Sequence, residues 1–235
     1  MNLGVFFANL GDQFVQTFLE KSRWKYFASG LGTTLLITVF AVMLGVVLGF
    51  LLAYVRTTHD RTGRMGFLNV VAKIYLTVIR GTPTMVQLLI MYFIIFGSVN
   101  INAIIVAILA FGINSGAYVA EIFRSGIMSI DPGQMEAARS LGLSYTQATW
   151  KVILPQAVKN VLPALGNELI TLLKETSISG YIAIQDLTRG ADIIRSQTYS
   201  AFFPLLSAAA IYLVLVIGLE KLLGSMEARL AQSDR

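Results

Sequence analysis

The residues of this sequence best suited to chemistry are ionisable side chains inside otherwise apolar segments. Three of them are the carboxylates Glu121, Glu168 and Glu175. An ionisable group at membrane depth can bind a proton, a cation or the charged group of a substrate, so these residues indicate a transport path. The alternative is local pairing, of Glu121 with Arg124 one turn on and of Glu168 with Lys174. In that case the charges only satisfy each other.

Uncharged polar side chains occur in the same apolar segments. Gln87, Asn114 and Ser115 can each hydrogen-bond either a substrate or a neighbouring helix. Together with Glu121 and Glu168 they make up the candidate substrate path. No residue is a candidate for covalent catalysis.

The sequence contains no nucleotide-binding loop. The pattern GxxxxGK[ST], whose backbone amides cradle phosphates in P-loop ATPases, does not occur. Transport by this chain must therefore draw its energy from elsewhere. We expect that the chain is not an enzyme and that it binds no cofactor or metal itself.

The elements that must position these groups are membrane helices. The sequence is 55% hydrophobic and only 13% charged, whereas soluble domains are about 25% charged. Uncharged runs cover residues 26–55, 81–120 and 196–219, and about 20 helical residues cross a bilayer. The middle run is long enough for two spans with a turn at 97–100, and residues 160–182 form a further span despite their charges. We therefore expect an all-α polytopic membrane protein with five transmembrane helices.

Glycine and proline positions in these segments predict how the helices pack and where the chain bends. Gly45 and Gly49 have a GxxxG spacing, which favours close packing within this subunit over a dimer seam. Arg80 precedes Gly81 and Pro83, a pattern that predicts a bend between an interfacial helix and a short span. We expect Arg80 to anchor that bend at the lipid headgroups.

A polar stretch, residues 131–156, separates two apolar segments. Asp131 can cap a helix, Pro132 suits its first position, and Gln134 completes a capping-box pattern with the aspartate. Gly142 lies where a left-handed residue would end this helix. The first helix of the stretch is therefore expected to stop at the glycine.

A second short helix is expected directly after the glycine. Ser144 and Gln147 form another capping-box pattern, and Pro155 marks the expected end of the helix. The stretch is thus a helix-turn-helix with the properties of a docking element. DNA binding is disfavoured, because the stretch is tethered at both ends to membrane spans and its basic residues Arg139 and Lys151 are offset by acidic ones. We expect no nucleic-acid partner.

Three regions follow from this pattern. Residues 1–27 form an external interfacial segment, residues 28–225 form the transmembrane domain, and residues 226–235 form a cytoplasmic tail. Lys and Arg are more frequent beside the spans on the side of the polar stretch, so the stretch and the C-terminus face the cytoplasm and the N-terminus lies outside. A polar connection with Asp186 and Arg189 joins the last two spans.

The polar stretch resembles the EAA motif of ABC importer permeases. That pattern is EAA, three residues, glycine, nine residues, isoleucine, one residue, leucine and proline. Further runs similar to the polar amino acid uptake branch are RGTP at 80–83, YVAEI at 118–122 and KETS at 174–177. The residues that match the EAA pattern are Glu136, Ala137, Ala138, Gly142, Leu154 and Pro155, with Val152 where the family usually has isoleucine.

The resemblance implies a type I ABC importer permease-like fold in a bacterial plasma membrane. It implies a second permease subunit, either a copy or a paralogue, and separate ABC ATPase subunits that hold the ATP. An external substrate-binding protein would deliver a polar amino acid. The polar stretch would be the coupling helix, through the residues Glu136, Ala137, Ala138, Gly142 and Leu143.

The rival hypothesis is an ion-coupled secondary transporter or a channel subunit. It would use Glu121 or Glu168 as a proton or cation site. It leaves the capped polar stretch unexplained. Dependence of uptake on ATP separates the two hypotheses.

Overall fold

The computed structural model describes residues 10–232, and all of the regular structure in that range is helical. The parts of the expected terminal segments at 1–9 and 233–235 lie outside the described residues. The α-helices are α2 (Trp24–Thr62), α3 (Gly66–Arg80), α4 (Thr84–Ile90), α5 (Ala103–Met128), α6 (Pro132–Ser140), α7 (Tyr145–Ala148), α8 (Leu154–Glu175), α9 (Leu187–Thr198) and α10 (Phe202–Gln232). The π-helical turns are η1 (Val15–Leu19), η3 (Met91–Ile95) and η4 (Thr149–Ile153), and the 3₁₀ segments are η2 (Glu20–Ser22) and η5 (Thr176–Ile182).

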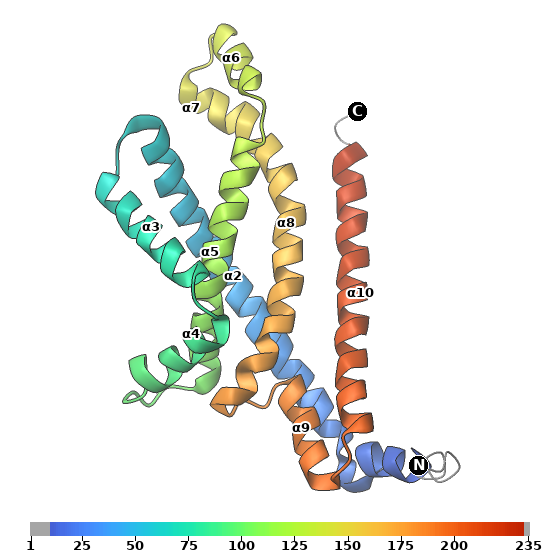
Figure 1. Ribbon diagram of the computed structural model, residues 1–235. Helices are drawn as coiled ribbons and strands as arrows, with labels where there is room; N and C mark the ends of the chain where they lie inside the picture. The colour runs from blue at the N-terminus through green and yellow to red at the C-terminus, as the bar shows by residue number, and fades with distance from the viewer. Residues whose placement is uncertain (1–9, 233–235) are drawn as a thin grey trace.

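The long helices form an elongated bundle (Figure 1). Helices α6 and α7 lie at one end, which we call the loop end, and α9 lies with the N-terminal segment at the other, which we call the far end. Helix α5 packs against α2 and α8, while α10 meets the rest of the chain through α8 and α9. Most of α10 is therefore exposed in a single copy of the chain.

Three helices are long and apolar enough to cross a membrane, within Trp24–Asp60, Ala103–Met128 and Phe202–Arg229. The bent pair formed by α3 and residues 84–95 gives a fourth if it is one span. Helix α8 is not in this set, because its charges lower its hydropathy. The count on this criterion is three or four, short of the expected five.

The predicted bend at residues 81–83 is confirmed. The helix axis turns by 108° between α3 and the segment that begins at Thr84. Pro83 has an extended backbone and directly precedes α4, and a proline at this position removes no helical hydrogen bond.

The GxxxG pair packs within the subunit, as predicted. A Cβ added at Gly45 would lie 2.8 Å from Ser115 Oγ, and one added at Gly49 would lie 2.5 Å from Val119 Cγ1. Both neighbours belong to α5. The two glycines therefore let the backbones of α2 and α5 approach closely.

Replacing Gly49 with alanine is expected to destabilise the bundle by about 1–3 kcal/mol, because the new methyl group overpacks the α2–α5 contact. Gly32 is a matched control in the same helix, since nothing lies within 4 Å of an added Cβ there. Thermal unfolding of the two detergent-solubilised variants checks the prediction. Equal midpoints for the two variants would rule out this contact as the reason for the glycine.

The polar connection between α8 and α10 is a helix rather than an irregular loop. Asp186 caps α9 by accepting a hydrogen bond from the Arg189 amide at 2.6 Å. On the exposed side, Asp192 pairs with Arg189 at 2.8 Å and with Arg195 at 2.6 Å. These arginines hold the pKa of Asp192 below its usual range. Capping and spaced ion pairs together explain the helix that sequence reasoning missed.

Burial raises the pKa of the Asp186 carboxyl to about 6. Because this value lies above the pKa of 3.8 expected without burial, the folded state binds the proton more tightly than the unfolded state. Stability is therefore expected to fall as the pH rises from about 4 to about 6 and then to stay level. Unfolding midpoints measured from pH 4 to pH 8 should show this fall, and Asp186→Asn should flatten it. An unchanged profile in the variant would assign the pH dependence to another group.

Candidate functional site

Helix α6 begins at the predicted residue, but the Gln134 side chain does not form its predicted contact. Asp131 Oδ1 accepts a hydrogen bond from the Gly133 amide at 2.8 Å, and Pro132 occupies the first turn. The expected capping box with Gln134 is not formed. Instead, Gln134 Oε1 accepts a hydrogen bond from Gln156 Nε2 at 3.4 Å. A tertiary partner has replaced the local one.

The turn between α6 and α7 has the predicted geometry. Gly142 has φ +85°, the left-handed conformation in which a glycine has no steric penalty. The Leu143 amide donates to Ala138 O, which satisfies a carbonyl at the end of α6. Ser144 and Gln147 form the second capping box, with bonds of 2.9 and 3.3 Å. Local chemistry therefore fixes the angle between the two loop helices.

The prediction that the second helix ends at Pro155 is wrong. The chain stays helical from α7 through the π turn η4 into α8, and Pro155 lies in the first turn of α8. Within η4 the Leu154 amide donates to Thr149 O, five residues back. Where helical segments of different pitch meet, the missing amide of a proline is accommodated more easily. The polar stretch therefore continues directly into α8.

The polar stretch, residues 131–156, is called the polar loop from here on. Its surface carries both apolar and charged side chains. Leu141 is 84% exposed and Trp150 is 64% exposed, which suits them as anchors for a partner protein. Glu136 is exposed and lines a groove of about 710 Å³ together with Met135. Sequence reasoning missed Trp150, although a tryptophan in a polar loop was a visible signal.

The two alanines of the motif have different environments. Ala137 is exposed, whereas Ala138 is 4% exposed and packs inside the loop. The small size of Ala138 therefore serves packing within this chain. Leu143 is half-buried behind the Gly142 turn.

Hydrogen bonds brace the loop against α8. Asn160 Nδ2 donates to Ser129 Oγ at 2.9 Å, which ties α8 to the end of α5. The pair of Gln134 and Gln156 ties α8 to α6 in the same way. Gly126 and Val161 are in close contact where α5 crosses α8. These contacts connect α8 to both α5 and α6.

Gln87 and Asn114, two polar residues of the candidate path, stabilise the bend between α3 and α4. Gln87 Nε2 donates to Ile79 O at 2.7 Å and to Thr82 Oγ1 at 2.7 Å, and so satisfies groups exposed by the break between α3 and α4. Asn114 Nδ2 donates to Gln87 Oε1 at 2.9 Å and is 1% exposed. These side chains bond neighbouring helices, which is one of the two alternatives that the sequence left open.

Glu168, on α8, contacts the residue of α5 that follows Asn114. Ser115 Oγ donates to Glu168 Oε1 at 2.7 Å. The expected pairing of Glu168 with Lys174 is not formed, and no ion pair among residues 10–232 involves either side chain. Glu168 is half-buried.

A polar stripe on α8 accompanies Glu168. Asn167, Thr171 and Lys174 are exposed and lie at a spacing of four and three residues, which places them on one helix face. A face of this kind does not suit lipid, because polar groups at membrane depth face protein or water. Sequence reasoning missed Asn167 and Thr171, which a helical wheel of α8 would have revealed.

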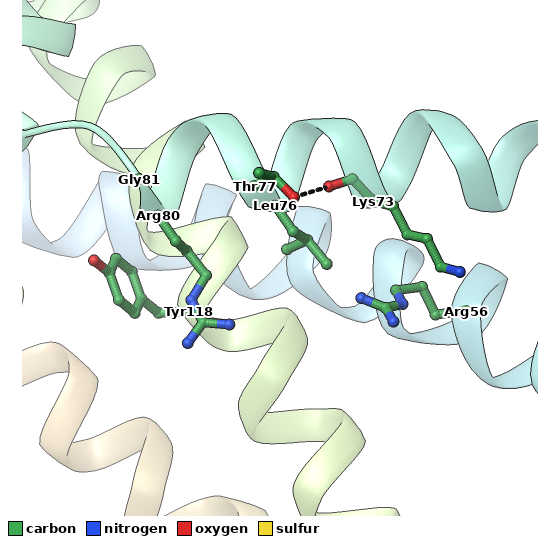
Figure 2. A pocket seen from close by; sticks show the side chains of 7 residues that line it. All are labelled: Arg56, Lys73, Leu76, Thr77, Arg80, Gly81 and Tyr118. Carbon is green, nitrogen blue, oxygen red and sulfur yellow. Dashed lines mark hydrogen bonds between the residues drawn. The ribbon is translucent and has the colours of Figure 1, made fainter.

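Glu121 takes part in an ion-pair chain. It lies 3.9 Å from Arg124, the predicted local partner, and 3.6 Å from Arg80, while Arg124 lies 3.6 Å from Asp60. Arg80 also lies over the ring of Tyr118 at 5.8 Å, and Figure 2 shows the two side chains next to each other. The guanidinium of Arg80 is thus directed at α5, and anchoring at the lipid headgroups stays a prediction.

A rigid exposed loop and charges without ion-pair partners on one of its long helices fit a membrane protein that takes part in transport. The chain belongs to the family described as the binding-protein-dependent transport system inner membrane component, whose sequence pattern matches residues 45–232. Its function is that of the membrane permease of an ATP-driven importer. The alternative of an ion-coupled carrier is not favoured.

Known proteins agree with this assignment. The chain is 39% identical to the arginine transport system permease protein ArtQ of Bacillus subtilis over 211 residues, which cover 89% of this chain and 94% of that one. It is similar to a chain in a crystal structure of an amino acid ABC transporter with histidines, with a TM-score of 0.81 and 48% identity over 87% of this chain and 94% of that one. The MetNI methionine ABC transporter, at 19% identity and a TM-score of 0.73 over 90% and 99% of the two chains, shares the fold. The fold is thus that of a type I ABC permease.

Proposed function

We propose that this chain imports a polar amino acid and that α6 and α7 form its coupling helix on separate ATPase subunits. The observation that carries the proposal is the rigid loop itself. Its turn is fixed by Gly142 and by the Ser144–Gln147 capping box. Leu141 and Trp150 are the most exposed large apolar side chains on its surface. A preorganised helical loop of this kind can bind a groove on a partner protein with little loss of conformational entropy.

Five spans complete the proposed topology. Helix α8 is the additional span, since it leads from the loop end toward the far end between α5 and α10 (Figure 1). The loop end faces the cytoplasm and the far end, with residues 10–23 and α9, faces outward, in agreement with the excess of Lys and Arg beside the loop. The chain itself holds no nucleotide, and ATP remains on the partner subunits.

A second permease subunit, identical or paralogous, covers the polar stripe of α8. The stripe residues Asn167, Thr171 and Lys174 are exposed in one copy of the chain. A water-filled path between two subunits satisfies them without lipid contact. Glu168 then faces this path and binds a positively charged group of the cargo. Such a cargo agrees with the names of two similar proteins, an arginine permease and an amino acid transporter with histidines.

The transport step follows from the connection of the loop to α8. Closure of the ATPase pair moves the coupling helices, and the bonds from Asn160 and Gln156 pass that movement to α8. The carboxylate of Glu168 moves with α8, so the path switches from one side of the membrane to the other. An external binding protein delivers the amino acid at the far end.

Mild-detergent purification of the tagged chain from its native membrane tests the proposal. We expect an ATPase with a P-loop to co-elute, and to be lost when Glu136 and Gly142 are both replaced. A permease that elutes without any ATPase, under conditions that keep other membrane complexes intact, would contradict the proposal.

A further inference from the structure

A cavity of about 600 Å³ lies between α2, α3 and α5, apart from Glu168 and the α8 stripe. Three of its lining side chains are cations, Arg56 from α2 and Lys73 and Arg80 from α3. Figure 2 shows Lys73 and Arg80 extending from α3 on the side that faces α2 and α5, with Arg56 of α2 on that same side. The wall of the cavity is therefore strongly basic.

Only one of the three cations is balanced by a carboxylate. Arg80 pairs with Glu121 at 3.6 Å, whereas no ion pair in the described part of the chain includes Arg56 or Lys73. Arg56 Nε is buried without a hydrogen-bond partner. A buried guanidinium nitrogen without a partner is costly. Lys73 is exposed and also unpaired, so the cavity carries net positive charge.

The unbalanced charges lie toward the loop end of the bundle. Arg56 is about one helical turn before Asp60, which pairs with Arg124 near the end of α5. Lys73 lies about 10 Å along α3 from its start at Gly66, whereas the balanced Arg80 lies about 21 Å along it. The unbalanced positive charge therefore lies nearer the loop end than the balanced pair of Arg80 and Glu121 does.

An apolar surface adjoins the cavity. One face of α3 is exposed and uniformly apolar, which suits contact with acyl chains. Its residues are Phe67, Val70, Val71, Ile74 and Val78. The face that carries Lys73, Thr77 and Arg80 lies beside it. Basic groups next to an acyl-chain surface match the two parts of a phospholipid.

We propose that this cavity binds the phosphate of an anionic phospholipid headgroup from the cytoplasmic leaflet. The proposal rests on the orientation proposed above, because basic pockets between helices at the cytoplasmic surface meet a leaflet rich in anionic lipid. Arg56 and Lys73 bind the phosphate oxygens, and the acyl chains follow the apolar face of α3. The bound lipid holds α3 against α2 and α5.

The amino acid cargo fits this cavity less well. A zwitterion also needs a partner for its ammonium group, and none of the residues that line this cavity is a carboxylate. Glu121, which pairs with the lining residue Arg80, also pairs with Arg124. An ammonium group would instead face Arg56 and Lys73. A phosphate diester requires only positive partners.

Native mass spectrometry tests the proposal on the permease complex reconstituted in nanodiscs of equal phosphatidylglycerol and phosphatidylethanolamine. The wild-type complex is expected to retain phosphatidylglycerol on each copy of this chain, with a preference over phosphatidylethanolamine of about tenfold, the factor for 1.4 kcal/mol. Arg56→Gln with Lys73→Gln should abolish the preference. Arg64→Gln, an exposed arginine outside the cavity, should retain it.

Two results would overturn the proposal. One is equal lipid retention by the wild-type complex and the double variant. The other is displacement of the retained lipid by millimolar inorganic phosphate or free amino acid, which would show that the cavity serves a soluble anion. Co-elution of the ATPase with the double variant shows that the variant is folded. Loss of the ATPase from the wild-type chain would instead reject the proposed function and leave the lipid measurement valid.

Discussion

Replacing Gly142 with valine is expected to uncouple transport from ATP hydrolysis. Gly142 has φ +85°, where a residue with a Cβ is strained by about 1–2 kcal/mol and a β-branched one by more. The strain is relieved by a change in the turn, which redirects α6 relative to α7. Because 1.4 kcal/mol of lost docking free energy is a factor of about ten, ATP-dependent uptake should fall about tenfold or more.

The chain contains a matched control for this variant. Gly63, at the end of α2, is the other glycine with positive φ in the described residues, at +68°, and nothing lies within 4 Å of an added Cβ at either position. Gly63→Val introduces the same backbone strain outside the polar stretch, in the turn that follows α2. Uptake and substrate-stimulated ATPase activity are measured for both variants in proteoliposomes. Equal losses in the two would assign the effect to general strain and would contradict a docking role for the loop.

Replacing Glu168 with glutamine is expected to weaken cargo binding within the membrane. The amide keeps an acceptor for Ser115 Oγ, which bonds the carboxylate at 2.7 Å, but it removes the charge. A hydrogen bond to a charged group contributes about 1.5–3 kcal/mol, so the substrate concentration for half-maximal uptake should rise about 10- to 150-fold.

Ser115→Ala separates the charge of Glu168 from its hydrogen bond. This variant keeps the carboxylate and loses only the Ser115 donor, so uptake should change by less than in Glu168→Gln. Co-elution of the ATPase should be normal in both variants, since neither residue lies in the polar loop. A Glu168→Gln variant with wild-type uptake would exclude the carboxylate from the substrate path.

Features with short-range causes were predictable from the sequence. The caps at Asp131 and Ser144 and the left-handed Gly142 depend on side chains within three residues of the turn they stabilise. The bend at 81–83 follows from glycine and proline chemistry. The α2–α5 contact at Gly49 was predictable because small residues at a spacing of four form a groove on a helix.

Features with long-range causes were not predictable in this way. Gln134 has a good local partner and still bonds Gln156. Arg80 pairs with Glu121, which lies on another helix, and no local pattern indicates that pairing. In each case the tertiary arrangement selected among partners that the sequence treats as equivalent.

The sequence identified the polar residues of the candidate site but did not predict which of them lie together. Sequence reasoning grouped Gln87 and Asn114 with Glu168 because all are polar residues in apolar segments. The structure separates them, because the two amides satisfy the bend while Glu168 lies next to the exposed stripe of α8. Exposure depends on how helices assemble, and the spacing of residues in one helix does not determine it.

The most direct test of the central claim is uptake by proteoliposomes that contain the purified permease complex with its binding protein. Ionophores collapse all ion gradients, and ATP is supplied on the side of the polar loop. The account predicts accumulation of a polar amino acid that requires ATP and is lost in Gly142→Val. Accumulation that stops when the gradients collapse, whether or not ATP is present, would contradict it and would make Glu168 the ion site of a carrier.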